Sequence, residues 1–238
     1  MTAPAAPVSK EGGVLITPKV LGGLVVAGVI AWMAPFDLAF SAMTFGIPAV
    51  RAGSMVILAL AGLVIGRQIG LGVEPRDLKR SVFTPIAVAL AMAIWCAIAD
   101  RLLQSGASPD YLRYMASTPL WSRLLYFIVR AFNENILYRL FLGSALIWVI
   151  GRIWKADDGR PSVGAFHTGF FLSQSINIWI NLISGTPITP ASLLYDVVRF
   201  ILPGLAYGWL YWRHGFQSNE IACTTVHLFF QPLASLRL

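Results

Sequence analysis

The chain has 238 residues, of which 57% are hydrophobic and only 12% are charged. Soluble domains carry about a quarter charged residues, so this chain lacks the polar side chains that a water-exposed surface of its size needs. The composition excludes a disordered chain, a fibrous repeat and a secreted disulfide scaffold, and it predicts an integral membrane protein. Its net charge of +7 fits cationic loops beside anionic lipid, so we expect membrane lipids and no nucleic acid as partners of these charges.

Seven apolar segments of the sequence have about the 20 residues that a membrane-spanning helix needs, and the fourth of them is overlong. They are 19–35, 50–68, 82–99, 120–149, 162–183, 192–212 and 218–236. We therefore expect an all-α fold, a polytopic transmembrane bundle of about seven helices. The chain then divides into a cytoplasmic N-terminal segment over 1–18, transmembrane helices over 19–119 and a core over 120–238 that carries most of the polar residues.

The basic residues of the loops fall unevenly on the two sides of such a bundle. One side receives ten of them and the other side receives five. The ten are Lys10, Lys19, Arg67, Arg76, Lys79, Arg80, Arg152, Lys155, Arg160 and Arg213. Because cytoplasmic loops carry the excess of Lys and Arg, we expect a cytoplasmic N-terminus and an external C-terminus. The membrane we expect is the bacterial inner membrane.

Charged side chains inside a span are costly, so each is a candidate functional residue. In the fourth segment, Arg130 and Glu134 lie four residues apart and can pair on one helical face. Arg139 lies about 140° further round an α-helix than Glu134, so we expect its partner on a neighbouring helix. In the sixth segment, Asp196 and Arg199 fit an interfacial pair whose charged ends reach toward water. The charges of the fourth segment fit either a structural ion-pair network or a functional site.

Two later segments carry further polar side chains. His227 and Gln231 in the seventh segment share a helical face, where the histidine is either a packing residue or part of a site. In the fifth segment, His167 lies near the start, and Ser175 can hydrogen-bond to a neighbouring helix. Together with the charges of the fourth segment, these groups predict a polar pocket inside the bundle.

The order and spacing of these motifs resemble those of a known family. The stretch ENILYR over 134–139 resembles the E-E-x-x-x-R signature of the CPBP intramembrane proteases, which include CAAX proteases and bacteriocin-processing enzymes. The glycine-rich stretch over 204–215 looks like the penultimate helix of that family. The stretch HLFFQ over 227–231 resembles its H-x-x-x-N signature. The resemblance covers roughly residues 120–235.

The resemblance implies an intramembrane endopeptidase that cuts a membrane-associated peptide or protein without a cofactor or a metal ion. Glu134 takes the place of the general base that activates water, and Arg139 takes the place of the arginine of the signature. Asn135 stands where the family has a second glutamate. Gln231 stands where the family has the asparagine that polarises the scissile carbonyl, next to His227. We expect Glu134, Arg139, His227 and Gln231 to line one cavity.

The F-x-x-x-H signature of the family has two alignments here. By its separation from Glu134, the histidine is His167, with Val163 in the phenylalanine position. In the other alignment, Phe171 begins the frame and Ser175 replaces the histidine. The second alignment removes one catalytic histidine, so a catalytically degenerate member that binds a membrane partner is the alternative function. A small transporter or channel is a third.

Overall fold

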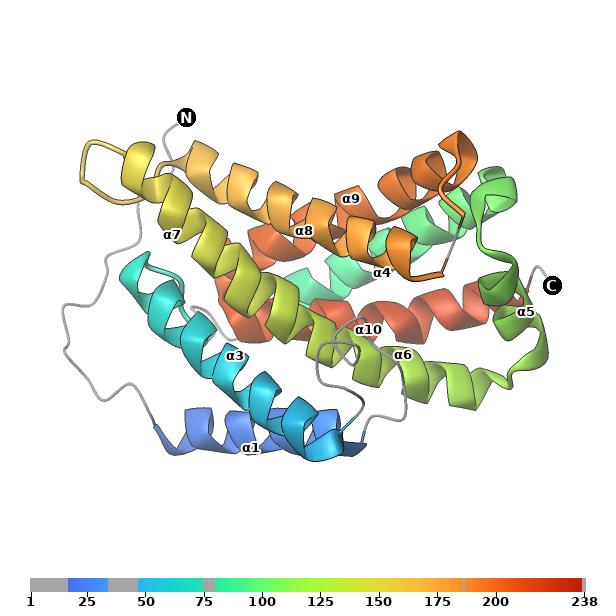
Figure 1. Cartoon of the computed structure of the whole chain (residues 1–238), viewed down its shortest axis with the longest axis horizontal. Coiled ribbons are helices and arrows are strands. Elements are labelled where there is room, and N and C mark those ends of the chain that lie inside the picture. The colour runs from blue at the N-terminus through green and yellow to red at the C-terminus, as the bar shows by residue number, and fades with distance from the viewer. Residues whose placement is uncertain (1–16, 34–46, 75–79, 186, 237–238) are drawn as a thin grey trace.

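The computed structural model describes residues 17–33, 47–74, 80–185 and 187–236. Over these ranges the chain forms helices and no strand, and the expected all-α fold is confirmed (Figure 1). The helices are α1 (Pro18–Met33), α3 (Pro48–Gln68), α4 (Arg80–Leu102), the 3₁₀ turn η1 (Gln104–Gly106), α5 (Pro109–Ser117), α6 (Leu120–Asn135), the π-helix η2 (Ile136–Gly143), α7 (Ser144–Ile153), α8 (Val163–Gly185), α9 (Pro190–His214) and α10 (Phe216–Ser235).

Each of the seven predicted segments forms a helix, and α6, η2 and α7 together form the overlong fourth one. Among the residues described, four stretches are long and apolar enough to cross a membrane: Pro48–Gln68, Val82–Leu102, Leu120–Ile153 and Pro190–His214. The helix α1 is apolar but shorter. The helices α8 and α10 are not among the four, because polar residues interrupt their apolar sequence. The apolar helices are those of an integral membrane protein.

Some expectations fall on residues outside the described ranges. Residues 1–16 of the expected cytoplasmic segment are among them, as is the end of the first predicted helix at 34–35. So are the basic residues Lys10, Arg76 and Lys79.

Successive long helices run back and forth along the bundle (Figure 1). The helix α10 packs against α4, α6 and α9, whereas α8 lies against α7 and α9, and α1 pairs with α3. The helices α4 and α10 approach closely because small residues meet between them. Ala89, Ala93 and Ala97 of α4 belong to the same buried cluster as Ala222 and Cys223 of α10. The position of α10 brings its polar residues next to those of α6.

The outer faces of the helices are apolar. Val25, Ile57, Ile94, Trp179 and Val197 are large hydrophobic residues on five different helices, and all are exposed. Exposed apolar surface on this scale is unfavourable in water but suits the hydrocarbon of a bilayer. These faces therefore contact lipid when the protein is in its membrane.

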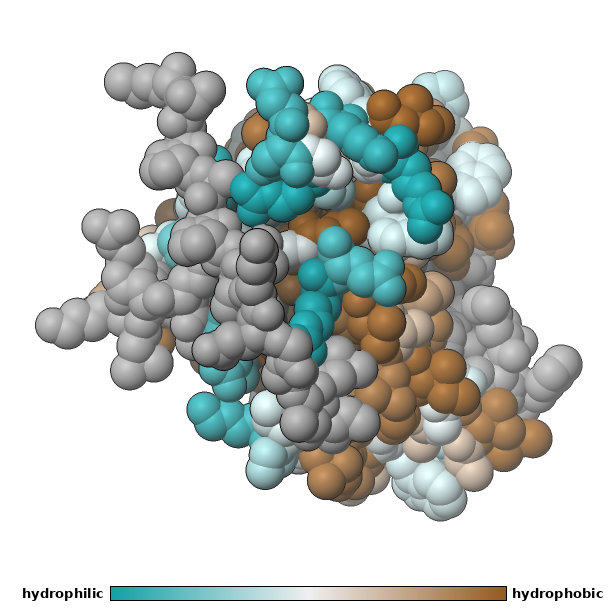
Figure 2. All heavy atoms as spheres, turned by 90° about the vertical axis from the view of Figure 1, so that its left-hand side faces the viewer, coloured by the Kyte–Doolittle hydropathy of each residue, from teal (hydrophilic) through white to brown (hydrophobic). Residues whose placement is uncertain are grey.

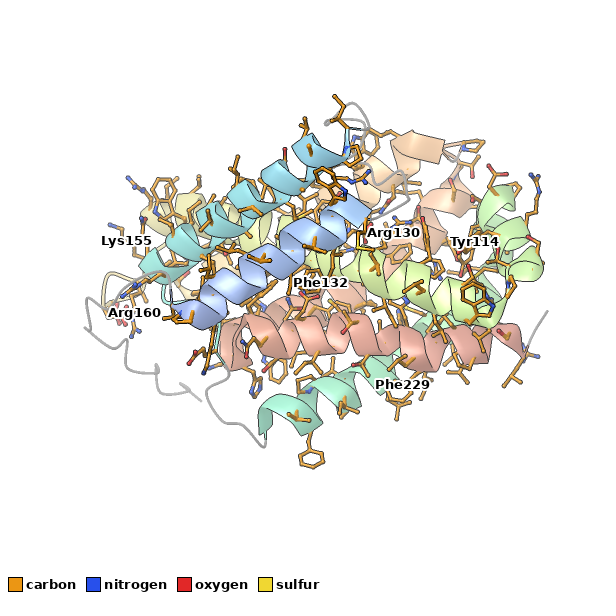
Figure 3. All side chains as sticks on the ribbon, turned by 90° about the horizontal axis from the view of Figure 1, so that it is seen from below. Tyr114, Arg130, Phe132, Lys155, Arg160 and Phe229 are labelled. Carbon is orange, nitrogen blue, oxygen red and sulfur yellow. The ribbon has the colours of Figure 1, made fainter. Side chains whose placement is uncertain are left out.

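The two ends of the bundle carry different groups. Lys155 and Arg160 lie between α7 and α8 at one end, and Tyr114 of α5 lies at the other (Figure 3). Figure 2 looks onto the end with Lys155 and Arg160, where hydrophilic side chains gather. The turn between α9 and α10 lies close to the end of α3, because the Phe216 N–H donates to the Gly72 carbonyl at 3.0 Å.

A single residue, Gly215, connects α9 to α10. Its φ of 93° lies in the region that residues with a side chain rarely adopt. A Cβ atom at this position would also lie 2.5 Å from the carbonyl oxygen of Glu74. Both the backbone conformation and the close contact therefore require glycine here.

The crossing of α3 with η2 depends on Gly62, where an added Cβ would lie 2.5 Å from the Leu140 carbonyl oxygen. We expect Gly62→Ala to lower the stability by about 1–3 kcal/mol, because both backbones must move apart. Gly53→Ala on the same helix is the matched control, since a Cβ there meets nothing within 4 Å. Thermal unfolding in detergent should show a lower Tm for Gly62→Ala alone. Equal Tm values would contradict the close crossing.

Candidate functional site

A cavity of about 300 Å³ lies among α6, η2, α8, α9 and α10. Glu134, Arg139, His227 and Gln231 all line it, so the expectation that these four residues share one cavity is confirmed. Other polar residues that line the cavity include Arg130, Gln174, Asn177, Asn181, Asp196 and Arg199. Its remaining walls are largely apolar, with aromatic rings from α6, α9 and α10. The cavity can hold a small polar group inside an apolar bundle.

Glu134 is held in place by its own helix and by α8. Arg130 pairs with it at 2.7 Å between Nε and Oε1, as the four-residue spacing predicts. Arg130 also donates to Asn181 Oδ1 at 3.1 Å, and Asn181 donates to Asn177 Oδ1 at 3.0 Å. This chain of contacts fixes the carboxylate of Glu134 at the cavity wall. About a quarter of the Glu134 side chain stays exposed.

Arg139 reaches the same cavity because its helix changes type. Residues Ile136–Gly143 form a π-helix, in which each turn takes in nearly one residue more than an α-helical turn. Two residues five apart therefore return closer to one face, which reduces the angle expected for Glu134 and Arg139. The buried guanidinium of Arg139 donates to Gln174 Oε1 of α8 and lies over the ring of Tyr207. The expectation of a partner on another helix is confirmed.

His227 and Gln231 lie one turn apart on α10. The imidazole of His227 stacks on the ring of Phe127, with 5.3 Å between the ring centroids. The side chain of Gln231 is completely buried. Its Nε2 and Oε1 atoms, and Nδ1 of His227, have no hydrogen-bond partner among the residues that the structure describes. Buried polar atoms are nearly always paired, so these three atoms lack a partner that a group bound at the cavity wall can supply.

Asn135 lies outside the cavity in a buried polar cluster between α6 and α10. It donates to Glu220 Oε2 at 2.7 Å and accepts from Asn219 Nδ2 at 2.9 Å. Sequence reasoning singled out Asn135 but missed both partners. The signal was present, since Asn219 and Glu220 both fall inside the predicted segment 218–236.

The structure does not bring His167 or Ser175 to the cavity. His167 is exposed and lies in a T-shaped contact with Trp212, with 5.6 Å between the ring centroids. The hydroxyl of Ser175 donates to the Phe171 carbonyl of its own helix at 2.9 Å. Gln174, one residue earlier, is the part of α8 that lines the cavity and binds Arg139. Neither alignment of the second signature therefore places its polar side chain with Glu134.

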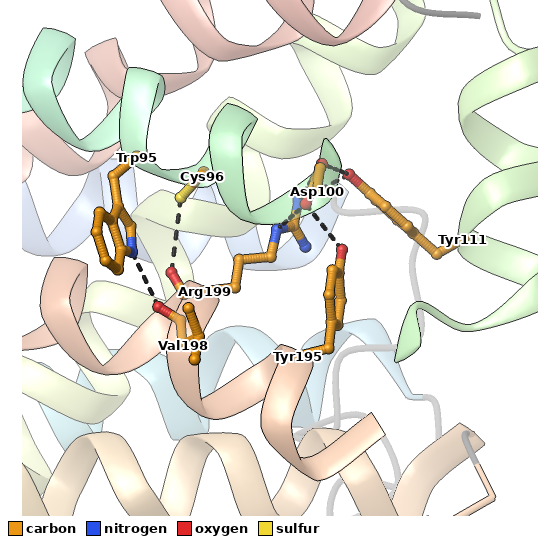
Figure 4. A network of polar contacts seen from close by, with 7 residues as sticks. All are labelled: Trp95, Cys96, Asp100, Tyr111, Tyr195, Val198 and Arg199. Carbon is orange, nitrogen blue, oxygen red and sulfur yellow. Dashed lines mark hydrogen bonds and ion pairs between the residues drawn. The ribbon is translucent and has the colours of Figure 1, made fainter. Parts of the chain in front are cut away.

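A second polar network, missed in the sequence, joins α4, α5 and α9 (Figure 4). Asp100 pairs with Arg199 at 2.7 Å and accepts from the hydroxyls of Tyr195, at 2.9 Å, and Tyr111, at 3.1 Å. Arg199 also donates to the Tyr111 oxygen at 2.7 Å. Burial raises the pKa of Tyr111 above its ordinary value, so the phenol remains a donor. The expected pairing of Arg199 with Asp196 at the interface is wrong, because Asp100 offers a buried partner across the helix packing.

No group of three His, Cys, Asp or Glu side chains could hold a metal ion in the described part of the chain. Comparison of the chain with protein-family models, with curated proteins and with solved structures finds no match.

Proposed function

We propose that this protein is an intramembrane endopeptidase that resembles the CPBP family and cuts membrane-associated peptides with water activated by Glu134. One observation carries the proposal. A carboxylate, an imidazole and an amide, from Glu134, His227 and Gln231, line one cavity inside an apolar bundle. These are a base and two groups that can donate hydrogen bonds to a developing oxyanion.

In the proposed reaction, Glu134 accepts a proton from water as the water oxygen bonds to the carbonyl carbon of the scissile peptide. The carbonyl electron pair moves onto oxygen, and Gln231 Nε2–H and a ring N–H of His227 donate to it. Collapse of this intermediate breaks the C–N bond, and Glu134 returns the proton to the leaving nitrogen. Arg130 keeps the carboxylate of Glu134 in position throughout.

The proposal includes the bacterial inner membrane as the location, with a cytoplasmic N-terminus. The uneven distribution of Lys and Arg in the loops supports this orientation. Lys155 and Arg160, two of the residues in that count, lie together at one end of the bundle (Figure 3). The back-and-forth course of the long helices places alternate loops on the same side, as the count assumes.

A second function is favoured by a specific observation. The carboxylate that the reaction needs is already engaged, because Arg130 pairs with Glu134 at 2.7 Å. In addition, α8 brings no histidine to the cavity. Both features suit a catalytically degenerate CPBP-like protein that uses the cavity to bind a membrane partner.

Peptide cleavage by the purified protein decides between these two functions. We expect the wild-type protein in liposomes to cut members of a library of hydrophobic peptides, detected by mass spectrometry. Glu134→Gln keeps the shape of the side chain but removes the base, so cleavage should fall about a hundredfold or more. Asp196→Asn is the control, since it removes a carboxylate of the same cavity that has no step in the reaction. No cleavage by any of the three proteins would favour the binding function.

A further inference from the structure

Gln231 offers more hydrogen-bonding capacity than the proposed reaction uses. A primary amide carries two donor hydrogens on nitrogen and an acceptor on oxygen. The reaction assigns a role to Nε2 alone, yet Oε1 is equally buried and equally without a partner in the described residues. A completely buried amide whose nitrogen and oxygen both lack a partner fits a ligand that supplies one acceptor and one donor.

The group that meets Gln231 is neutral, because the unpaired atoms of this wall offer hydrogen bonds and no charge. Each of the three arginines that line the cavity already bonds to another side chain. The pairs are Arg130 with Glu134, Arg139 with Gln174 and Arg199 with Asp100. The open atoms belong to uncharged groups, and the same face of α10 adds the apolar walls of Val226 and Phe230. This wall therefore offers hydrogen bonds rather than a counter-charge.

An extended peptide main chain supplies the required pair of atoms. In a β-strand, the N–H and the C=O of one residue point to the same side, and an antiparallel partner residue bonds to both. A side-chain amide can take the place of that partner. A carboxylate lacks the N–H, and so does an ester. The proline main chain also lacks it.

We infer that Gln231 binds the main chain of one substrate residue at both of its atoms, with Nε2–H donating to the carbonyl and Oε1 accepting the N–H. This inference rests on the proposed function and adds to it the substrate class and a specificity rule. The carbonyl is that of the scissile bond. The N–H therefore belongs to the same residue, which lies directly N-terminal to the cut bond. That residue is bound in extended form, and it is neither proline nor N-methylated.

Binding to the Glu134→Gln protein tests the inference without any need for cleavage. The probes are acetylated tri-leucine amides, one unmodified and three carrying a single N-methyl group at successive residues. We expect the unmodified peptide to raise the Tm in detergent, and one N-methylated peptide to bind about tenfold more weakly or worse, because Oε1 loses its donor. In Glu134→Gln/Gln231→Leu, all four peptides should bind equally.

The design distinguishes loss of binding through misfolding from loss of binding through removal of the amide. The side chain of Gln231 makes no hydrogen bond among the described residues, so Gln231→Leu removes none and its ligand-free Tm should match that of the parent protein. Gln231→Asn keeps both amide atoms and should restore part of the discrimination between peptides. No stabilisation by the unmodified peptide, or discrimination that survives Gln231→Leu, would overturn the inference.

The inference and the proposed function can fail separately. If the protein discriminates between unmodified and N-methylated peptides but the wild type cleaves none, the main-chain contact is supported and the peptidase function is contradicted. Cleavage at sites with proline directly before the cut bond would support the peptidase function and contradict the contact between Oε1 and an N–H. Mapping of the cleavage sites by mass spectrometry reports both.

Discussion

Arg199→Leu should destabilise the protein by about 3–5 kcal/mol, because it leaves the carboxylate of Asp100 buried without its cation. The side chains of Arg199 and Asp100 are only 9% and 17% exposed, and their ion pair links α9 to α4. The same guanidinium bonds to Tyr111 of α5, so its loss removes contacts among three helices (Figure 4). A large fall in Tm in detergent should accompany a fall in expression.

The control for this variant is Arg113→Leu. Arg113 pairs with Asp110 at 3.5 Å, but both side chains are more than three quarters exposed, and such pairs contribute about 1 kcal/mol or less. Its Tm should therefore stay close to that of the wild-type protein. Asp100→Leu combined with Arg199→Leu should recover much of the loss, because no unpaired charge remains. A single Arg199→Leu variant as stable as the wild type would refute the buried network.

Arg139→Ala should also lower the Tm strongly. Its buried guanidinium bonds to Gln174, and a hydrogen bond to a charged group contributes about 1.5–3 kcal/mol. The variant also loses the packing of a large side chain over Tyr207. Glu134→Gln keeps the shape and most of the hydrogen bonding of its residue, so its Tm should fall much less.

The comparison of these two variants in detergent carries functional information. A stable Glu134→Gln variant without cleavage would fit the general base. If Glu134→Gln instead melts as early as Arg139→Ala, the ion pair with Arg130 is mainly structural, and the binding function gains support.

The helices and half of the candidate site were predictable because they depend on local sequence. Runs of apolar residues fix where the spans lie, and the four-residue spacings of Arg130 with Glu134 and of His227 with Gln231 fix shared helical faces. The sequence predicts that the partner of Arg139 lies on another helix, but it does not identify the residue. Which residue of α8 meets it depends on the rotation of that helix in the bundle.

That rotation explains the two residues that miss the cavity. The buried face of α8 carries Phe170, Ser173, Gln174 and Asn177, and a short motif cannot reveal which face of an apolar helix is buried. Ser175 lies about 100° from Gln174 on this helix. The π-helix was equally hidden, because its wider turn reflects packing against neighbouring helices and no composition marks it.

The network around Asp100 was missed because its members are distant in sequence. Asp100 follows the predicted third segment by one residue, so the sequence does not mark it as an intramembrane charge. Its partner Arg199 was assigned to Asp196, the nearest acid on the same helix. Spacing along one helix reveals local pairs only, whereas the packing of α4 against α9 decides this one.

The one-residue connection at Gly215 makes this corner of the chain intolerant of changes in length. Each residue added to an α-helix turns everything after it by about 100°, so an insertion here would rotate the remainder of α10 unless the junction absorbed it. Only one residue separates the helices, and the carbonyl of Glu74 lies close to it, so the junction cannot accommodate an extra residue. The loop that contains Asp158 is exposed and can accommodate added residues, so it is the natural place for an epitope tag or a fused domain.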